Sequence, residues 1–323
     1  MKMQKAVVVV PTNRESNIKE FLAAWQSNFD SVEMIVVEDS PTRTFLIDGY
    51  DNVTHYAWDD IDRDLGNDSW IISRKTDCIR SYGFLKAYSL QSDMVVTLDD
   101  DCFPPEGQRN FLQEHWSCLE KQASSDAWQT TGAGVASRGI PYYTRARQWP
   151  CVINHGLWMG VPDFDSPTQL LSARHDFSFS PVNQVIPPGS YFPMCGMNLA
   201  FRPQVIPALY FLLMGATWGV DRFGDIWSGI IVKKICDHLG FAIRSGEPSI
   251  VHRRASNVWD NLSKEANGLR SNEDFWLAID RIVLHSDSFP DCYIEIASQL
   301  PAPGEYWCSL KQAMITWAKL FTP

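Results

Sequence analysis

Residues 95–106 read VVTLDDDCFPPE, and this stretch predicts both a buried strand and the edge of a binding site. Its first four residues are β-branched or apolar, the type that fills a sheet interior. The run then delivers Asp99, Asp100 and Asp101 before it stops at two prolines. Because three neighbouring carboxylates repel one another, we expect positive charge to lie among them.

Two similar strands precede this one in the chain. Residues 6–10, AVVVV, form a predicted parallel strand broken by Pro11, and residues 33–40, EMIVVEDS, form a second that ends in acids. Apolar residues with helical spacing follow the first strand, and residues 76–90 form a predicted helix before the third. This alternation predicts an α/β fold with a doubly wound sheet and right-handed crossovers.

Polar residues fall at the ends of all three strands. Thr12 and Asn13 follow the first, Asp39 follows the second, and the three aspartates follow the third. Ligands of doubly wound sheets lie beyond the carboxyl ends of the strands. A turn or a helix cap would explain one such acid, but three polar ends on one rim predict a nucleotide-binding site.

The second half of the chain is less periodic. Residues 130–200 are rich in Gly, Pro and aromatic residues, which predicts long ordered loops with short strands. Helices are expected at 204–214 and 226–239, and a short strand at 248–252. We therefore divide the chain into an α/β domain at 1–255, which carries the binding site, and a C-terminal helical extension at 256–323.

Composition excludes several classes of protein. A net charge of −10 over 323 residues argues against a general nucleic-acid-binding surface. The eight cysteines are scattered without a CxxC pair, and no stretch approaches the roughly 20 apolar residues of a membrane span. The N-terminal apolar run is too short for a signal peptide. We expect a reduced, cytoplasmic protein with no membrane span.

The aspartates predict a metal site. On an extended chain Asp99 and Asp101 point the same way while Asp100 faces elsewhere. Mg²⁺ and Mn²⁺ prefer such oxygen ligands and share sites with phosphates. His252, after a short apolar strand, is a candidate third ligand, although a lone histidine is as often a structural hydrogen-bonding residue. The neighbouring Arg253 could neutralise phosphate oxygens.

Two further groups are candidates for chemistry. Asp225 precedes a predicted helix, where it could cap the helix or act as a base, and Trp227 could offer a stacking platform to a sugar. Arg138 and Arg145 lie in the loop RGIPYYTR. They are either surface charges or clamps on phosphate or sugar.

Several longer segments together carry a resemblance to a known family. They are DDIDRDLG (59–66), TLDDDCF (97–103), RGIPYYTR (138–145), HGLWMGVPDFDSPTQL (155–170), FPMCGMNLAF (192–201), FGDIWSG (223–229) and HRRASN (252–257). In order and nearly over the whole length, the chain resembles the UDP-arabinopyranose mutases, or reversibly glycosylated polypeptides. These proteins in turn resemble metal-dependent GT-A glycosyltransferases, so the resemblance implies a mixed sheet of that type.

The resemblance also implies roles for residues. The aspartates at 99–101 match the family's acidic metal and nucleotide motif, Arg138 matches an arginine that becomes glycosylated, and Arg145 matches a second arginine required for activity. It implies interconversion of UDP-arabinopyranose and UDP-arabinofuranose with Mn²⁺ or Mg²⁺ and no flavin. The lack of a GxGxxG motif agrees with the absence of flavin and nicotinamide. The conspicuous polar residues of the matching segments are predicted to contact the sugar: His155, Asp163, Asp165 and Asn198.

Three functions are compatible with these residues. In a mutase, the pocket retains UDP and the detached sugar while the ring recloses, and we expect Arg138 and Arg145 to clamp the diphosphate, since guanidinium is a poor nucleophile. In a glycosyltransferase, which moves a sugar to a separate acceptor or to itself, Asp225 would be the base. The third is a non-enzymatic sugar-nucleotide binder in a complex. The sequence leaves homo- and hetero-oligomers open.

Overall fold

The computed structural model describes residues 3, 5–131, 138–161, 163–171, 183–253 and 257–322. The strands are β1 (Ala6–Thr12), β2 (Glu33–Glu38), β3 (Val53–Tyr56), β4 (Met94–Leu98), β5 (Cys102–Phe103), β6 (Ala123–Asp126), β7 (Ala146–Trp149), β8 (Cys151–Gly160), β9 (Asn183–Val185), β10 (Asn198–Phe201) and β11 (Ala242–His252). The α-helices are α1 (Glu15–Phe29), α2 (Trp58–Leu65), α3 (Ile79–Ser89), α4 (Phe111–Glu120), α5 (Ser166–Leu171), α6 (Gly224–Leu239), α7 (Val258–Arg281), α8 (Phe289–Gln299) and α9 (Glu305–Lys319), with 3₁₀ turns η1 (Gly66–Ile71) and η2 (Pro203–Ala208).

Nine of the described strands form one mixed sheet in the order β3-β2-β1-β4-β10-β8-β11-β5, with β9 paired to β11. The first four are parallel, β10 is antiparallel to both β4 and β8, and β11 is parallel to β8. Two reversals at β10 mean that β8 and β11 run in the same direction as β4. The carboxyl ends of β1, β2, β4, β8 and β11 therefore share one edge, and the predicted doubly wound mixed α/β class is confirmed.

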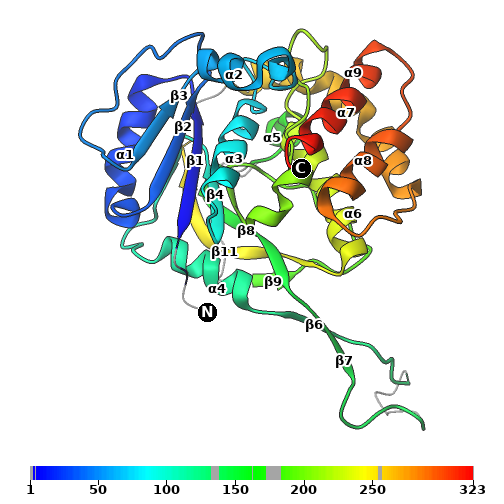
Figure 1. The fold of residues 1–323 in the computed structure, drawn as a ribbon. Helices are drawn as coiled ribbons and strands as arrows, with labels where there is room; N and C mark the ends of the chain where they lie inside the picture. Colours follow the sequence, from blue (N-terminus) through cyan, green and yellow to red (C-terminus); the bar gives the residue numbers. More distant parts are fainter. Residues whose placement is uncertain are drawn as a thin grey trace.

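Both faces of this sheet are covered. On β1, Val7 and Val9 face a cluster that includes α3, α6, α8 and α9, whereas Val8 and Val10 face a second cluster with α1 and α4. Figure 1 shows α1 and the C-terminal helices on opposite sides of the molecule. Since both faces are dry, the parallel strands read as continuous apolar runs, which is why the sequence located them correctly.

The prediction of loops with short strands at 130–200 was wrong for β8. This strand is 10 residues long and lies between β10 and β11. The sequence of β8 does not predict a strand of this length, because its glycines weaken the strand pattern. Gly156 is needed there: a Cβ at this position would lie 2.1 Å from Nδ2 of Asn198, whose side chain crosses the strand.

The helix predicted at 204–214 was also wrong beyond its first turn. Only η2 forms, and residues 209–214 continue as fully buried irregular chain. Pro207 cannot extend a helix. Side chains supply partners for the backbone instead, since Phe211 N donates to Ser81 Oγ and Met214 N to Ser73 Oγ.

The predicted C-terminal helices are present as α7, α8 and α9. Their apolar faces belong to the same hydrophobic cluster as α3 and α6, and Trp317 stacks on Tyr210 at 5.3 Å. The division predicted between residues 255 and 256 falls at 254–256, outside the described residues, and stays a prediction. None of the described helices has the length and apolar character needed to cross a membrane.

Candidate active site

A pocket of about 510 Å³ opens at the carboxyl edge of the sheet. Its walls come from the segments that follow β1, β2, β4, β8 and β11, together with the start of α6 and part of α7. The lining includes ten acidic side chains against five from lysine and arginine. Such a concave polar site at the strand ends is where doubly wound folds bind ligands, so this pocket is the candidate active site.

The three consecutive aspartates lie against two arginines. Asp99 forms an ion pair with Arg80, and Asp100 pairs with Arg14 and accepts a hydrogen bond of 2.6 Å from Thr12 Oγ1. Asp101 lies 3.7 Å from Arg14. The positive charge expected among the carboxylates thus comes from two arginines that contact them directly.

The expectation that Asp99 and Asp101 converge on one point rested on a backbone conformation that the structure does not show. It assumed an extended chain, but residues 99–102 form a turn, with Cys102 N donating to Asp99 O at 3.1 Å. Within the described part of the chain, no group of three His, Cys, Asp or Glu side chains is arranged to hold a metal ion. A metal at this edge would require Asp99 to turn from Arg80.

His252 presents a ring nitrogen to Asp101. Its Nδ1 lies 2.9 Å from the carbonyl oxygen of Val161, which can only accept, so Nδ1 donates to it. Nε2 faces Asp101 Oδ1 at 3.8 Å. Burial, followed by the charge of Asp99, raises the pKa of Asp101 to about 6. An imidazole nitrogen and a carboxylate that face each other are ligand types that suit Mg²⁺ or Mn²⁺.

A second acidic group lies on the α6 side of the pocket. Asp225 Oδ2 accepts from Gly196 N at 3.0 Å, and burial, with the neighbouring Asp77, raises the pKa of Asp225 to about 8. Burial likewise raises the pKa of Asp77 to about 6, and its Oδ1 makes no hydrogen bond. At neutral pH this pair of carboxyls therefore retains a proton, which is a condition for acid–base chemistry.

Comparison with known proteins now adds to this geometry. A sequence profile described as "Reversibly glycosylated polypeptide" matches residues 2–323. The chain is 35% identical to a probable UDP-arabinopyranose mutase 1 of Pisum sativum, over 97% of this chain and 89% of that protein. It is 35% identical to UDP-arabinopyranose mutase 3 of Arabidopsis thaliana and to UDP-arabinopyranose mutase 1 of Oryza sativa subsp. japonica, over 96% of this chain and 89% and 88% of those proteins.

The chain belongs to the reversibly glycosylated polypeptide family.

In this family member, the predicted nucleotide-binding residues lie mostly in the pocket. Thr12, Asn13 and Asp39 line it with the aspartates. Asp39 accepts from Trp58 Nε1 at 2.8 Å and from Lys75 N at 2.9 Å. Arg253 does not line it: its guanidinium pairs with Glu20 at 2.8 Å.

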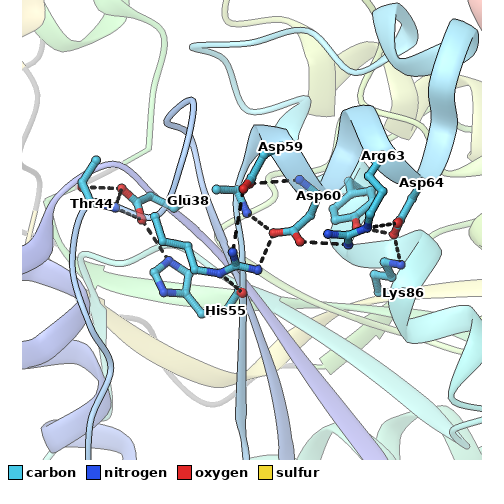
Figure 2. A network of polar contacts seen from close by, with 11 residues as sticks. Glu38, Thr44, His55, Asp59, Asp60, Arg63, Asp64 and Lys86 are labelled. Carbon is cyan, nitrogen blue, oxygen red and sulfur yellow. Dashed lines mark hydrogen bonds and ion pairs between the residues drawn. The ribbon is translucent and has the colours of Figure 1, made fainter.

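A polar network holds the rim near Asp39 in place. Figure 2 shows Glu38, the last residue of β2, beside Thr44 and His55, and Asp60 beside Arg63. Glu38 accepts from Thr44 N at 3.1 Å, and Asp60 also pairs with Arg43 at 2.6 Å. The segment 59–66, one of those that carry the family resemblance, forms α2 and supplies Asp60. Its acids therefore stabilise the wall of the pocket.

The predicted sugar-binding residues divide into two groups. Asp163 and Asp165 line the pocket, and Asp165 also caps α5 through Thr168 N at 2.9 Å. His155 and Asn198 do not line it, because their side chains are buried between strands. Asn198 Nδ2 donates to the carbonyls of Leu157 at 2.9 Å and Pro248 at 3.0 Å, and its Oδ1 lies 3.0 Å from His115.

Trp227 is not available as a stacking platform. Its indole is 0% exposed and stacks on Phe275 at 4.3 Å, while Nε1 donates to Asn272 at 2.9 Å. The tryptophan in the FGDIWSG segment therefore anchors α6 to α7 in the core. The proposed platform fails because a helix face that contacts a second helix cannot also face the pocket.

Arg138 and Arg145 are not brought together with the aspartates. Both are exposed, neither lines the pocket, and Arg145 Nε donates to the carbonyl of Pro141. They lie on the β6–β7 ribbon, which extends away from the rest of the molecule in Figure 1. In the structure of one chain, as described, neither arginine lies at this edge of the sheet.

Sequence reasoning missed the cations that neutralise the acids. Arg14 follows the polar end of β1, and Arg80 lies on the buried face of α3, where it is 3% exposed. Both could have been sought, since the acidic rim itself requires counter-charges. Asp77, Lys264 and Arg222 also line the pocket without having been predicted.

Proposed function

We propose that this protein is a mutase that interconverts UDP-arabinopyranose and UDP-arabinofuranose in the pocket at the carboxyl edge of the sheet. Support comes from relatives named UDP-arabinopyranose mutase that are matched over 96–97% of this chain. The observation that carries the proposal is the pocket itself, in which the acidic turn after β4 faces a proton-retaining carboxyl pair.

Binding of the nucleotide would rest on residues of both halves of the pocket. Asn13 and Asp39 lie where β1 and β2 end, the position at which doubly wound sheets hold a nucleoside. Lys264 and Arg222 lie in the same cavity and can approach an anionic diphosphate. Asp101 and His252 would hold Mn²⁺ or Mg²⁺, joined by Asp99 once it turns from Arg80, and the metal when bound would withdraw charge from that diphosphate.

Ring contraction requires a proton to move between two sugar oxygens. Once the anomeric C–O bond to UDP has broken, the former ring oxygen must gain a proton and the hydroxyl that recloses the ring must lose one. We assign the donor to Asp225, which remains largely protonated at neutral pH because burial raises its pKa to about 8. Asp77, whose pKa is lower, would accept the second proton and then pass it to Asp225, which restores both carboxyls. The anomeric carbon exchanges its bond to the former ring oxygen for one to the reclosing oxygen and then re-forms its bond to UDP, so the protein gains and loses no proton overall.

A mutase assay tests the proposal directly. Purified protein is incubated with UDP-arabinopyranose and Mn²⁺, and the products are separated by chromatography. We expect an isomeric nucleotide sugar. Slow hydrolysis alone would indicate a transferase that lacks its acceptor, and no turnover together with a stable hetero-oligomer would indicate a binding subunit. Asp101→Asn should abolish product, whereas Asp274→Asn, at an exposed position of α7, should not.

Metal binding is measured separately from turnover. Titration of Mn²⁺ into the protein by calorimetry should give a site that weakens at least tenfold in Asp101→Asn and in His252→Ala. The Asp274→Asn control should bind as the unaltered protein does. Binding that is equal in all four proteins would refute the metal assignment and leave the proton-transfer assignment standing.

A further inference from the structure

The β6–β7 ribbon lies at the opposite end of the sheet from the pocket of its own chain. We call it the arm, meaning residues 123–131 and 138–149 with Arg138 and Arg145. It leads into β8 at Cys151, and β8 runs toward the pocket, where Gly160 pairs with His252. Nine residue steps of β8 separate the base of the arm from the pocket edge, about 30 Å of strand.

The chain between these arginines and β8 limits their reach within one chain. Arg145 precedes Cys151 by six residues, and six residues of fully extended chain span about 20–22 Å. Arg138 precedes Cys151 by 13 residues, and to extend that stretch fully β7 would have to leave its pairing with β6, as between Ser125 and Arg147.

The arm exposes residue types that are common in protein-binding surfaces. Tyr143 is 99% exposed, Tyr142 83% and Trp128 44%, which is unusual for neighbouring large aromatic residues. Within the described residues β6 and β7 pair only with each other, and an isolated two-stranded ribbon has marginal stability in water. Aromatic residues and arginine dominate protein–protein contacts. The arm therefore needs a partner.

Charge indicates which partner. The described part of the arm contains three arginines and one aspartate in a chain whose net charge is −10. The pocket, with ten acidic side chains against five from lysine and arginine, carries the opposite sign. Complementary charge steers and orients association.

We propose that the arm of one copy docks at the pocket mouth of a second copy and places Arg145 and Arg138 beside the bound diphosphate. The functional part of this inference rests on the proposed mutase activity. The acidic pocket and the basic arm lie at opposite ends of the sheet. The arm of one copy can therefore supply its arginines to the pocket of a second copy.

Complementation in mixed oligomers tests the proposal. An arm variant, Arg138→Ala with Arg145→Ala, and a pocket variant, Asp99→Asn with Asp101→Asn, are co-expressed with different tags and purified through both. Each homo-oligomer should be inactive, whereas the mixed one should recover up to about half of the activity of a wild-type dimer, because one of its two sites combines an intact pocket with an intact arm. A mixed oligomer as inactive as its parents, or a wild-type protein that is monomeric at assay concentration, would overturn the proposal. Arg109→Ala, at an exposed position outside the arm, controls for loss of surface charge.

A crosslinking experiment gives an answer independent of activity. A photoreactive phenylalanine at Tyr143 should yield a species of doubled mass, with crosslinked peptides from residues 163–171 or 257–270 at the pocket mouth. The same group at Tyr88, which packs against Phe321, should not. If the protein forms no isomer but gives this crosslink, the mutase assignment fails and the docking stands. Crosslinks confined to one chain, or no crosslink, would refute the docking.

Discussion

Replacing Arg80 with methionine tests whether this cation holds the pocket together. The guanidinium is buried beneath the aspartates, where Nη1 donates to Thr97 Oγ1 at 2.8 Å and to the carbonyl of Gly196 at 2.6 Å. Nη2 pairs with Asp99. One side chain thus joins α3, β4 and the segment before β10.

The loss in free energy of unfolding caused by Arg80→Met can be estimated from these contacts. Removing one partner of a buried ion pair costs about 3–5 kcal/mol, and a buried acceptor left without a donor costs about 1–3 kcal/mol. The Asp99 side chain is 33% exposed and can regain water, which lowers the total. Methionine also refills most of the volume. We therefore expect Arg80→Met to lower the free energy of unfolding by about 3 kcal/mol.

Urea denaturation provides the assay, with the midpoint and slope compared between variants. Arg202→Met is the matched control, because Arg202 also bonds two carbonyl oxygens, at 3.3 and 3.4 Å, and should cost about 1 kcal/mol. Adding Asp99→Asn to Arg80→Met should recover about 1–2 kcal/mol by removing the unpaired charge. A loss below about 1 kcal/mol for Arg80→Met would refute the reasoning.

Three further outcomes follow from the structure. The pKa of Asp225 is raised to about 8 and that of Asp77 to about 6, so the folded protein holds protons that the unfolded chain releases above about pH 4. The buried His115 and His155, with pKa values lowered to about 3 and about 4, act in the opposite direction below about pH 6.5. Stability should therefore fall as pH rises from about 6.5 to 8, and Asp225→Asn should flatten that fall in urea midpoints; a steeper fall would contradict the sign. Trp227→Leu should cost about 3 kcal/mol and leave the KM for the nucleotide sugar unchanged, as measured by denaturation and initial rates; a large rise in KM would restore the stacking role. Gly83→Ala should cost about 1–3 kcal/mol because a Cβ there would lie 2.4 Å from Cγ1 of Val9, and calorimetric unfolding at an unchanged temperature would show that α3 can shift.

The sequence located the carboxyl edge of the sheet but not the geometry of its aspartates. The apolar runs of β1, β2 and β4 identify buried parallel strands, and their last residues necessarily lie on one rim. Whether Asp99 and Asp101 point together depends on the turn at 99–102, which a strand pattern does not encode. The burial of Trp227 was equally hidden, because an aromatic residue early in a helix suits a core and a binding site alike.

By itself the sequence determined the class of fold, the family, and the presence of an acidic site at the ends of β1, β2 and β4. The fold class and the site depend on residues close together in the chain, where hydrophobic periodicity and polar strand ends are directly visible, whereas the family rests on the resemblance of longer segments. Only the tertiary structure decided which cation neutralises each carboxylate and that the two arginines of the arm lie far from them. Arg80 reaches the carbonyl of Gly196 across 116 residues of sequence, and contacts of that range arise from the packing of whole elements, which no local pattern records.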